Sequence, residues 1–227
     1  MKMLLIAGLW LDASAWDAVI PRLERLGHRP IALSLPGQGA PPPDATLADQ
    51  REAVVSAVDA CAGPVVVVGH SAACTLAWMA ADSRPESVAH VVMIGGFPSG
   101  DGDLYADFFP AENGVVPFPG WGPFEGADAA DLDDQRREWI AARAIPVPEG
   151  VTKGLVKLGD EGRFGVPATV VCPEFSPAQA KEWVEGGEVP ELERARRLAF
   201  ADIDSGHWPM FTRPTELADL LDRVVTA

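Results

Sequence analysis

The sequence predicts an α/β fold, a mostly parallel six-stranded sheet flanked by helices, and three observations support it. Short apolar runs alternate with longer amphipathic segments along the 227 residues. The hydrophobicity of the runs is continuous rather than alternating, which is typical of strands buried on both faces of a sheet. The joins are short, as in right-handed β-α-β crossovers. The runs expected to form strands are 3–7, 31–35, 65–68, 91–95, 168–172 and 199–203.

Between the runs lie segments with helical patterning, and two of them have recognisable starts. Asp44 or Thr46 can cap the second helix, because short polar side chains accept hydrogen bonds from free N–H groups. Thr212 and Pro214 can open the last one, since proline fits the first helical turn. The segments expected to form helices are 14–26, 46–61, 72–82, 131–144, 190–198 and 213–225.

The alternation breaks once, between Phe97 and about Gly165, where no strand signal occurs. Long insertions in compact domains usually cover a site or bind something. This one is rich in aromatic residues, whereas disordered segments are poor in them. We therefore expect residues 1–96 and 166–227 to form the core domain. Residues 97–165 are expected to form a helical cap, inserted before the penultimate strand.

Composition excludes several function classes. The chain has 18 basic and 33 acidic residues, a net charge of −15, so nucleic acid and anionic membranes are poor partners. Cys61, Cys74 and Cys172 have no metal-ligand spacing, and no dinucleotide fingerprint occurs, so we expect no metal and no cofactor. The start, MKMLLIAGLWLD, reads as a first strand rather than a signal peptide. No apolar run approaches the ~20 residues of a membrane span. A cytoplasmic protein is expected, and a homodimer stays open.

The stretch VVVVGHSAAC, residues 65–74, carries the strongest functional signal. Gly69, Ser71 and Ala73 fit strand–G-x-S-x-small–helix, the nucleophile elbow that exposes a serine on a strained turn. Small residues two before and two after the serine let that turn pack tightly. The alternative is an ordinary strand-to-helix turn in which Ser71 only caps the helix. The buried strand before it and the apolar helix after it favour the nucleophile.

A nucleophilic serine needs a base and oxyanion donors. Among the four histidines, only His207 follows a strand at the carboxyl edge of the sheet, where Ser71 also lies. His28 and His90 precede strands, and His70 is turned away from its serine neighbour. The backbone N–H groups of Leu9, in the turn after the first strand, and of Ala72 are the expected oxyanion donors.

Three motifs together resemble the α/β-hydrolases of the small, capped kind that includes methylesterases, related small-ester esterases and hydroxynitrile lyases. They are LLIAGLWLDASAWDAVIPRLERLGHRPIALSLPGQG (4–39), VVVVGHSAA (65–73) and DIDSGHWPMFTRPTEL (202–217). The resemblance implies the α/β-hydrolase fold, with Ser71 as nucleophile and His207 as base. It also implies Leu9 and Ala72 as the oxyanion donors. Ala7 departs from the pattern, because the family usually has a histidine there.

The larger departure from the family pattern, compared with Ala7, concerns the acid of the triad. The family commonly has an aspartate in the loop after the penultimate strand, where this chain has Phe175 or Ser176. Glu174 is the carboxylate of this loop, and we assign it as the triad acid. The rivals that stay open are Asp204, Asp101 and Asp103.

The sequence thus predicts a serine hydrolase that cleaves a small or medium apolar ester, thioester or lactone through an acyl-enzyme. Two alternatives remain: a lyase or other non-hydrolytic reaction on the same fold, and an inactive small-molecule binder. Fold alone does not separate them. The expected pocket residues are Trp10, His70, Phe97, Phe118, Trp121 and Trp208.

Overall fold

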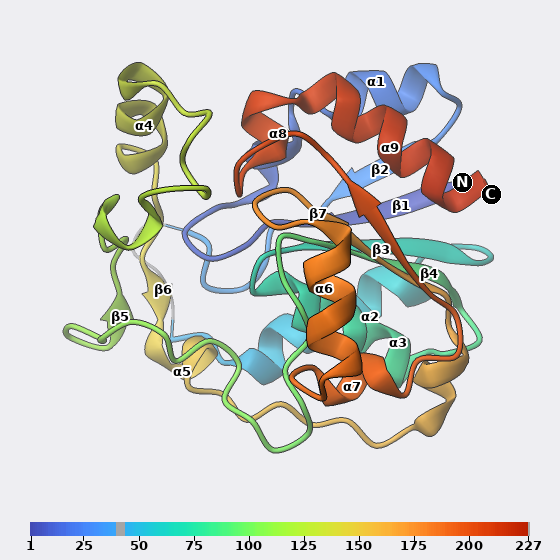
Figure 1. Cartoon of the computed structure of the whole chain (residues 1–227). Coiled ribbons are helices and arrows are strands. Elements are labelled where there is room, and N and C mark those ends of the chain that lie inside the picture. The colour runs from blue at the N-terminus through green and yellow to red at the C-terminus, as the bar shows by residue number, and fades with distance from the viewer. Residues whose placement is uncertain (40–43, 227) are drawn as a thin grey trace.

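The computed structural model describes residues 1–39 and 44–226, and its centre is one parallel sheet (Figure 1). The strand order is β2-β1-β3-β4-β7-β8, and all five strand pairs are parallel. This confirms the predicted six-stranded sheet. The strands are β1 Lys2–Ile6, β2 Arg29–Ala32, β3 Val65–His70, β4 Val88–Ile94, β7 Ala168–Cys172 and β8 Leu198–Asp202.

Helices cover both faces of the sheet. On one face lie α1 (Ile20–Arg25) and α9 (Pro214–Thr226), and on the other α2 (Leu47–Asp59), α3 (Ala73–Ser83) and α6 (Pro177–Glu185) (Figure 1). Successive side chains of a strand point to opposite faces. In β3, accordingly, Val65 and Val67 join one core and Val66 and Val68 the other. Burial on both faces is the reason why this strand is apolar at every position.

The second strand differs from its prediction, since it covers Arg29–Ala32 rather than 31–35. It lies at the edge of the sheet and is half exposed, with Ile31 41% accessible to solvent. An edge strand is not buried on both faces, so an apolar run does not mark its limits.

The helix predictions also need correction. The segment 14–26 is not one helix, because α1 covers only Ile20–Arg25. The segment 190–198 holds only the short α7, Pro190–Glu193, and β8 begins at Leu198. Helix α6 was not predicted, although it starts with a capping box in which Ser176 and Gln179 bond each other's backbone N–H. Thr46, rather than Asp44, caps α2 in the same way.

The segment between β4 and β7 lies beside the sheet and carries short elements only (Figure 1). Its two-residue strands pair antiparallel, and strands so short leave no periodic pattern in the sequence. The helix expected at 131–144 is present as α4. The elements are β5 Val115–Val116, the 3₁₀ turn η2 Gly122–Phe124, α4 Asp134–Ala141, β6 Val147–Pro148, α5 Glu149–Thr152 and the 3₁₀ turn η3 Glu161–Gly165.

Two short elements complete the chain, the 3₁₀ turn η1 at Ala13–Trp16 and α8 at Pro209–Thr212. Within the described ranges, no helix has the length and apolarity needed to cross a membrane.

A buried ionic cluster ties the core helix α3 to η3 and α7. The Arg163 guanidinium donates to Asp82 at 3.2 Å and to both oxygens of Glu191, at 2.9 and 3.2 Å. Trp78 Nε1 donates to the same Glu191 at 2.8 Å. The three charged side chains are 9% exposed or less. Removing one partner would leave buried charge unpaired, which costs far more than the pair itself contributes.

We therefore expect Arg163→Met to lower the free energy of unfolding by about 3–5 kcal/mol, measured by urea denaturation. Arg194→Met is the matched control, because both guanidinium groups lie over the Phe164 ring, at 4.1 and 4.0 Å. Arg194 pairs with Glu161, which is 77% exposed. Loss of this ion pair should therefore lower the free energy of unfolding by only about 0–1 kcal/mol. Equal losses in the two variants would contradict the expectation.

Candidate active site

Ser71 occupies a sharp turn between β3 and α3. Its φ is +55°, a left-handed conformation that is uncommon and strained for a residue with a side chain. Its N–H donates to the Ile94 carbonyl at 2.8 Å, which continues the β3–β4 ladder into the turn. A Cβ at Gly69 would collide with the Ala73 carbonyl, so only glycine lets the helix begin so close to the strand. This is the local geometry that the elbow pattern predicts.

His207 and Glu174 meet at the carboxyl edge of the sheet, after β8 and β7. His207 Nδ1 lies 2.7 Å from Glu174 Oε1, and both side chains are 13% exposed. A carboxylate accepts, so Nδ1 carries the proton and Nε2 of the neutral ring is left as an acceptor. A second bond, from the His207 N–H to the Asp128 carbonyl at 2.8 Å, holds the backbone.

The rival carboxylates lie elsewhere. Asp101 accepts the Leu158 N–H and Asp103 accepts the Gly100 N–H, each at 2.8 Å, and Asp204 is exposed. The carboxylate on His207 Nδ1 is therefore that of Glu174.

Gly95, at the end of β4, lies directly beneath this pair. A Cβ there would come within 3.1 Å of His207 Nδ1 and 3.2 Å of Glu174 Oε2. Its φ of +59° also disfavours any residue with a side chain. The second oxygen of Glu174 is buried and has no partner within the described residues.

The turn after β1 faces the elbow. A Cβ at Gly8 would lie 2.9 Å from Ser71 Cβ, so the two turns are nearly in contact. Trp10 has a φ of +62°, and its carbonyl accepts from the Ile145 N–H at 2.9 Å. In the part of the chain that the structure describes, the N–H groups of Leu9 and Ala72 donate no hydrogen bond. Neither N–H is therefore occupied by an internal acceptor in these ranges.

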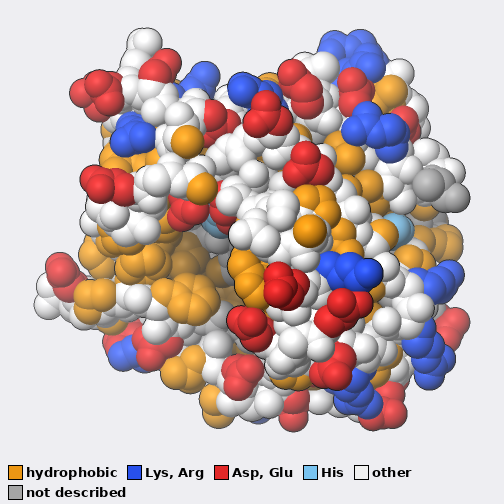
Figure 2. All heavy atoms as spheres, viewed as in Figure 1, with side chains coloured by type: hydrophobic (Ala, Val, Ile, Leu, Met, Phe, Trp, Pro, Cys, Tyr) orange, Lys and Arg blue, Asp and Glu red, His pale blue; other side chains and the backbone are white. Residues whose placement is uncertain are grey.

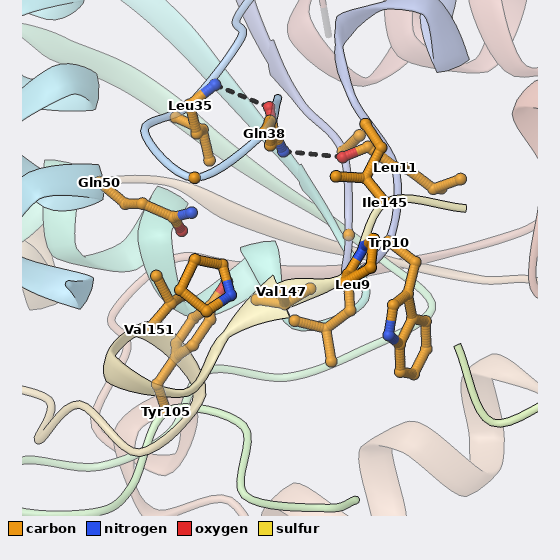
Figure 3. Close-up of a pocket in the computed structure, with 15 residues that line it drawn as sticks. Leu9, Trp10, Leu11, Leu35, Gln38, Gln50, Tyr105, Ile145, Val147 and Val151 are labelled. Carbon is orange, nitrogen blue, oxygen red and sulfur yellow. Dashed lines mark hydrogen bonds between the residues drawn. The ribbon is translucent and has the colours of Figure 1, made fainter. Parts of the chain in front are cut away.

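Gln38 supports this turn from behind, as Figure 3 shows. Its side-chain Nε2 donates to the Leu11 carbonyl at 2.7 Å, and its Oε1 accepts from the Leu35 N–H at 2.7 Å. The cavity between these groups has a volume of about 20 Å³, enough for one water molecule. Ser71 is not among the residues that line it.

A cavity of about 180 Å³ holds Ser71 and His207 together. Its lining is mostly apolar and, in the described ranges, includes no Lys, Arg, Asp or Glu. Phe108, 68% exposed, stands at its rim. Figure 2 shows hydrophobic side chains around a hollow on the side of the molecule that carries β5. The lining residues are Leu9, Trp10, His70, Ser71, Phe108, Phe109, Phe124, His207 and Trp208.

No hydrogen bond joins the Ser71 hydroxyl to His207 within the described residues. Catalytic hydrogen bonds are often long in ligand-free sites and tighten on binding.

Of the six residues expected to line a substrate pocket, Trp10, His70 and Trp208 line this cavity. Phe118 and Trp121 lie in a layer behind it, packed edge-on against Trp10 and Trp208 at 5.5 and 5.3 Å.

Phe97 lies outside the lining and stacks on Phe175 at 5.5 Å. Three lining aromatics, Phe108, Phe109 and Phe124, were missed. All three stand in the aromatic-rich insertion, but the path of the loop decides which rings face the cavity.

The two buried cysteines, Cys74 and Cys172, offer no competing nucleophile. Cys74 is buried beneath the elbow with its Sγ 3.4 Å from the Gly69 carbonyl, and burial raises the pKa of its thiol far above the usual range. Burial also raises the pKa of Cys172 to about 12. Protonated thiols are poor nucleophiles. The described ranges contain no cluster of His, Cys, Asp or Glu that could hold a metal ion.

Comparison with solved structures identifies the fold. An extracellular α/β-hydrolase from a Paenibacillus species is 20% identical, with 99% of this chain and 98% of that one covered at a TM-score of 0.79. A methylesterase from Arabidopsis is 15% identical, with 100% and 99% covered at a TM-score of 0.78. Tomato methylketone synthase I, bound to 2-tridecanone, is 15% identical, with 99% and 97% covered at 0.76.

No curated protein sequence matches the chain. The sequence model of one family does, over residues 3–220, nearly the whole length. The chain belongs to the alpha/beta hydrolase family.

Proposed function

We propose that this protein is a serine hydrolase that cleaves a small or medium apolar carboxylic ester, thioester or lactone. One observation carries the proposal: Ser71 and His207 line a single cavity, and Glu174 lies 2.7 Å from His207 Nδ1. This is the order of groups in a nucleophile–base–acid triad. Family membership supports hydrolase activity in general.

In the proposed reaction His207 Nε2 takes the proton of Ser71 as Oγ attacks the carbonyl carbon. The negative oxygen that forms accepts from the N–H groups of Leu9 and Ala72. The tetrahedral intermediate collapses, His207 returns the proton to the leaving alcohol or thiol, and an acyl-enzyme remains. His207 next takes a proton from water as the water oxygen attacks the acyl carbon. The second tetrahedral intermediate then loses its bond to Ser71 Oγ, His207 gives the proton to that oxygen, and a carboxylic acid leaves. Glu174 holds the tautomer and balances the charge of the protonated ring.

The cavity suggests the substrate class. At about 180 Å³ it is slightly larger than a cavity that accepts a benzene ring, which needs about 150 Å³. In the described ranges its lining includes no Lys, Arg, Asp or Glu, so the cavity favours a neutral, apolar part of a substrate. The net charge of −15 disfavours anions further.

The segment 97–165 is proposed as the cap that shapes this site. Phe108, Phe109 and Phe124 all belong to it and line the cavity. A cytoplasmic location is proposed from the three free cysteines.

A fluorophosphonate should label Ser71, and Ser71→Ala should abolish labelling and lower esterase kcat/KM by about 10³-fold or more, because the nucleophile is lost. Mass spectrometry of the labelled peptide identifies the serine. Ser83→Ala, at the other end of α3, is the control and should keep both. Activity above a tenth of wild type in Ser71→Ala would contradict the acyl-enzyme route and favour the lyase.

Glu174→Gln should lower kcat by about 10²–10⁴-fold, because an amide neither balances the imidazolium charge nor reliably holds the tautomer. Steady-state kinetics on a 4-nitrophenyl ester measures it, with circular dichroism to check the fold. Glu182→Gln, an exposed glutamate in the following helix, is the control for loss of one charge. Wild-type kcat in Glu174→Gln would remove this residue from the triad.

Phe108→Ala should change the ratio of kcat/KM values across esters of increasing acyl length by about tenfold, since it enlarges the rim of the cavity. Its melting temperature should stay close to wild type, because the ring is 68% exposed. Leu155→Ala, 56% exposed in the same segment but outside the cavity lining, should leave the ratio unchanged. An unchanged ratio in Phe108→Ala would argue against the cap.

A further inference from the structure

His70, the residue before the nucleophile, is a buried titratable group that the reaction above does not use. It is 1% exposed, at the end of β3. Its Nε2 lies 2.8 Å from the backbone carbonyl of His207. A carbonyl only accepts, so Nε2 carries the hydrogen and Nδ1 of the neutral ring is bare. The contact joins the nucleophile's strand directly to the loop of the base.

The other side of the same ring faces the oxyanion turn. A Cβ at Gly8 would come within 3.0 Å of His70 Nδ1, so the ring lies against the backbone of that turn. Nδ1 is buried and has no hydrogen-bond partner within the described residues. The ring of His70 therefore lies between the histidine loop and the oxyanion turn, and its centroid is 4.9 Å from that of His207.

The environment keeps this ring neutral. Burial, with a smaller contribution from the charge of His207, lowers the pKa of His70 to about 3. Protonation would add a hydrogen on the Nδ1 side, against Gly8, and a second positive charge beside His207. A ring that never titrates near neutral pH offers a fixed donor.

His207 is held at three points: Glu174 on its ring, Asp128 on its N–H and His70 on its carbonyl. Without His70 the carbonyl would lose the one side-chain partner that the described residues give it, and the loop could shift. Small displacements of a catalytic base are costly, because proton transfer depends steeply on distance and alignment.

We propose that His70 is a positioning residue: its Nε2–H fixes the His207 loop, and its ring sets the spacing between that loop and the oxyanion turn. The inference rests on the proposed hydrolase function and deepens it. His70 lines the same cavity, but in the proposed reaction it gains and loses no proton or bond. It acts on the reaction through His207 and Gly8.

Three variants test the inference with a 4-nitrophenyl ester and fluorophosphonate labelling. Glutamine carries its amide nitrogen about as far from Cα as histidine carries Nε2, so His70→Gln keeps a donor. His70→Leu has similar bulk and no donor. His90→Leu is the control, because His90 is another histidine of the sheet, half-buried and hydrogen-bonded to Thr169 at 2.9 Å outside the cavity.

We expect His70→Leu to lower kcat and the labelling rate together by about 10–100-fold, with KM changed by less than about threefold. His70→Gln should restore most of the loss, and His90→Leu should match wild type. Because His70 is neutral, the pH dependence of kcat should keep its wild-type shape in His70→Gln. Wild-type rates in His70→Leu, or a His70→Gln variant no faster than His70→Leu, would overturn the inference.

Two measurements keep the test decisive if His70→Leu does not fold. His70→Asn carries its amide nearer the Nδ1 position, so it should be at least about tenfold slower than His70→Gln. In the native protein, ¹⁵N spectra should show His70 as the Nε2–H tautomer without titration between about pH 5 and 8. An Nδ1–H tautomer or a titrating His70 would overturn the inference. Failure of the wild type to label at Ser71 would instead overturn the proposed function.

Discussion

The hydrogen bond from the Ser71 N–H to the Ile94 carbonyl is the interaction on which the site depends. It extends the β3–β4 ladder one residue past the strand and holds Ser71 in a left-handed conformation. A parallel sheet brings the carboxyl ends of its strands to one edge, so the residues after β1, β3, β4, β7 and β8 meet there. Leu9, Ser71, Gly95, Glu174 and His207 are those residues. These residues are far apart in the sequence, yet they lie in one site because each follows the end of a strand closely, without a long loop.

The sequence predicted the sheet, and it named most of the residues that meet at the candidate site, because both rest on local signals. Continuous valines mark β3, and small residues around Ser71 mark the turn. His207 could be chosen among four histidines from its place after the last strand alone. Contacts between side chains of different loops were harder to predict from the sequence. Glu174 had three rivals, because the path from β7 decides which carboxylate reaches Nδ1. Phe97 faces Phe175, while Phe108 reaches the cavity, and nothing local distinguishes these rings.

Close packing of backbone, rather than charge, shapes much of this site. Gly8, Gly69 and Gly95 each stand where a methyl group would meet a catalytic residue or its neighbour. They let two turns and the Glu174–His207 pair approach within van der Waals contact. The ionised groups are few, and the ring of His70 stays neutral through burial. In the proposed reaction, the charge that develops on the oxygen and on His207 would be met by backbone N–H dipoles and one carboxylate.

The bond between the Asp128 carbonyl and the His207 N–H joins the insertion to the base loop. Gly206 packs against the same carbonyl so closely that a Cβ would collide with it, and Asp131 lies 2.5 Å from that Cβ position. The insertion and the His207 loop are therefore packed as one unit at this point, and the position of the His207 backbone depends on residues 128–131 as well as on the strand before it.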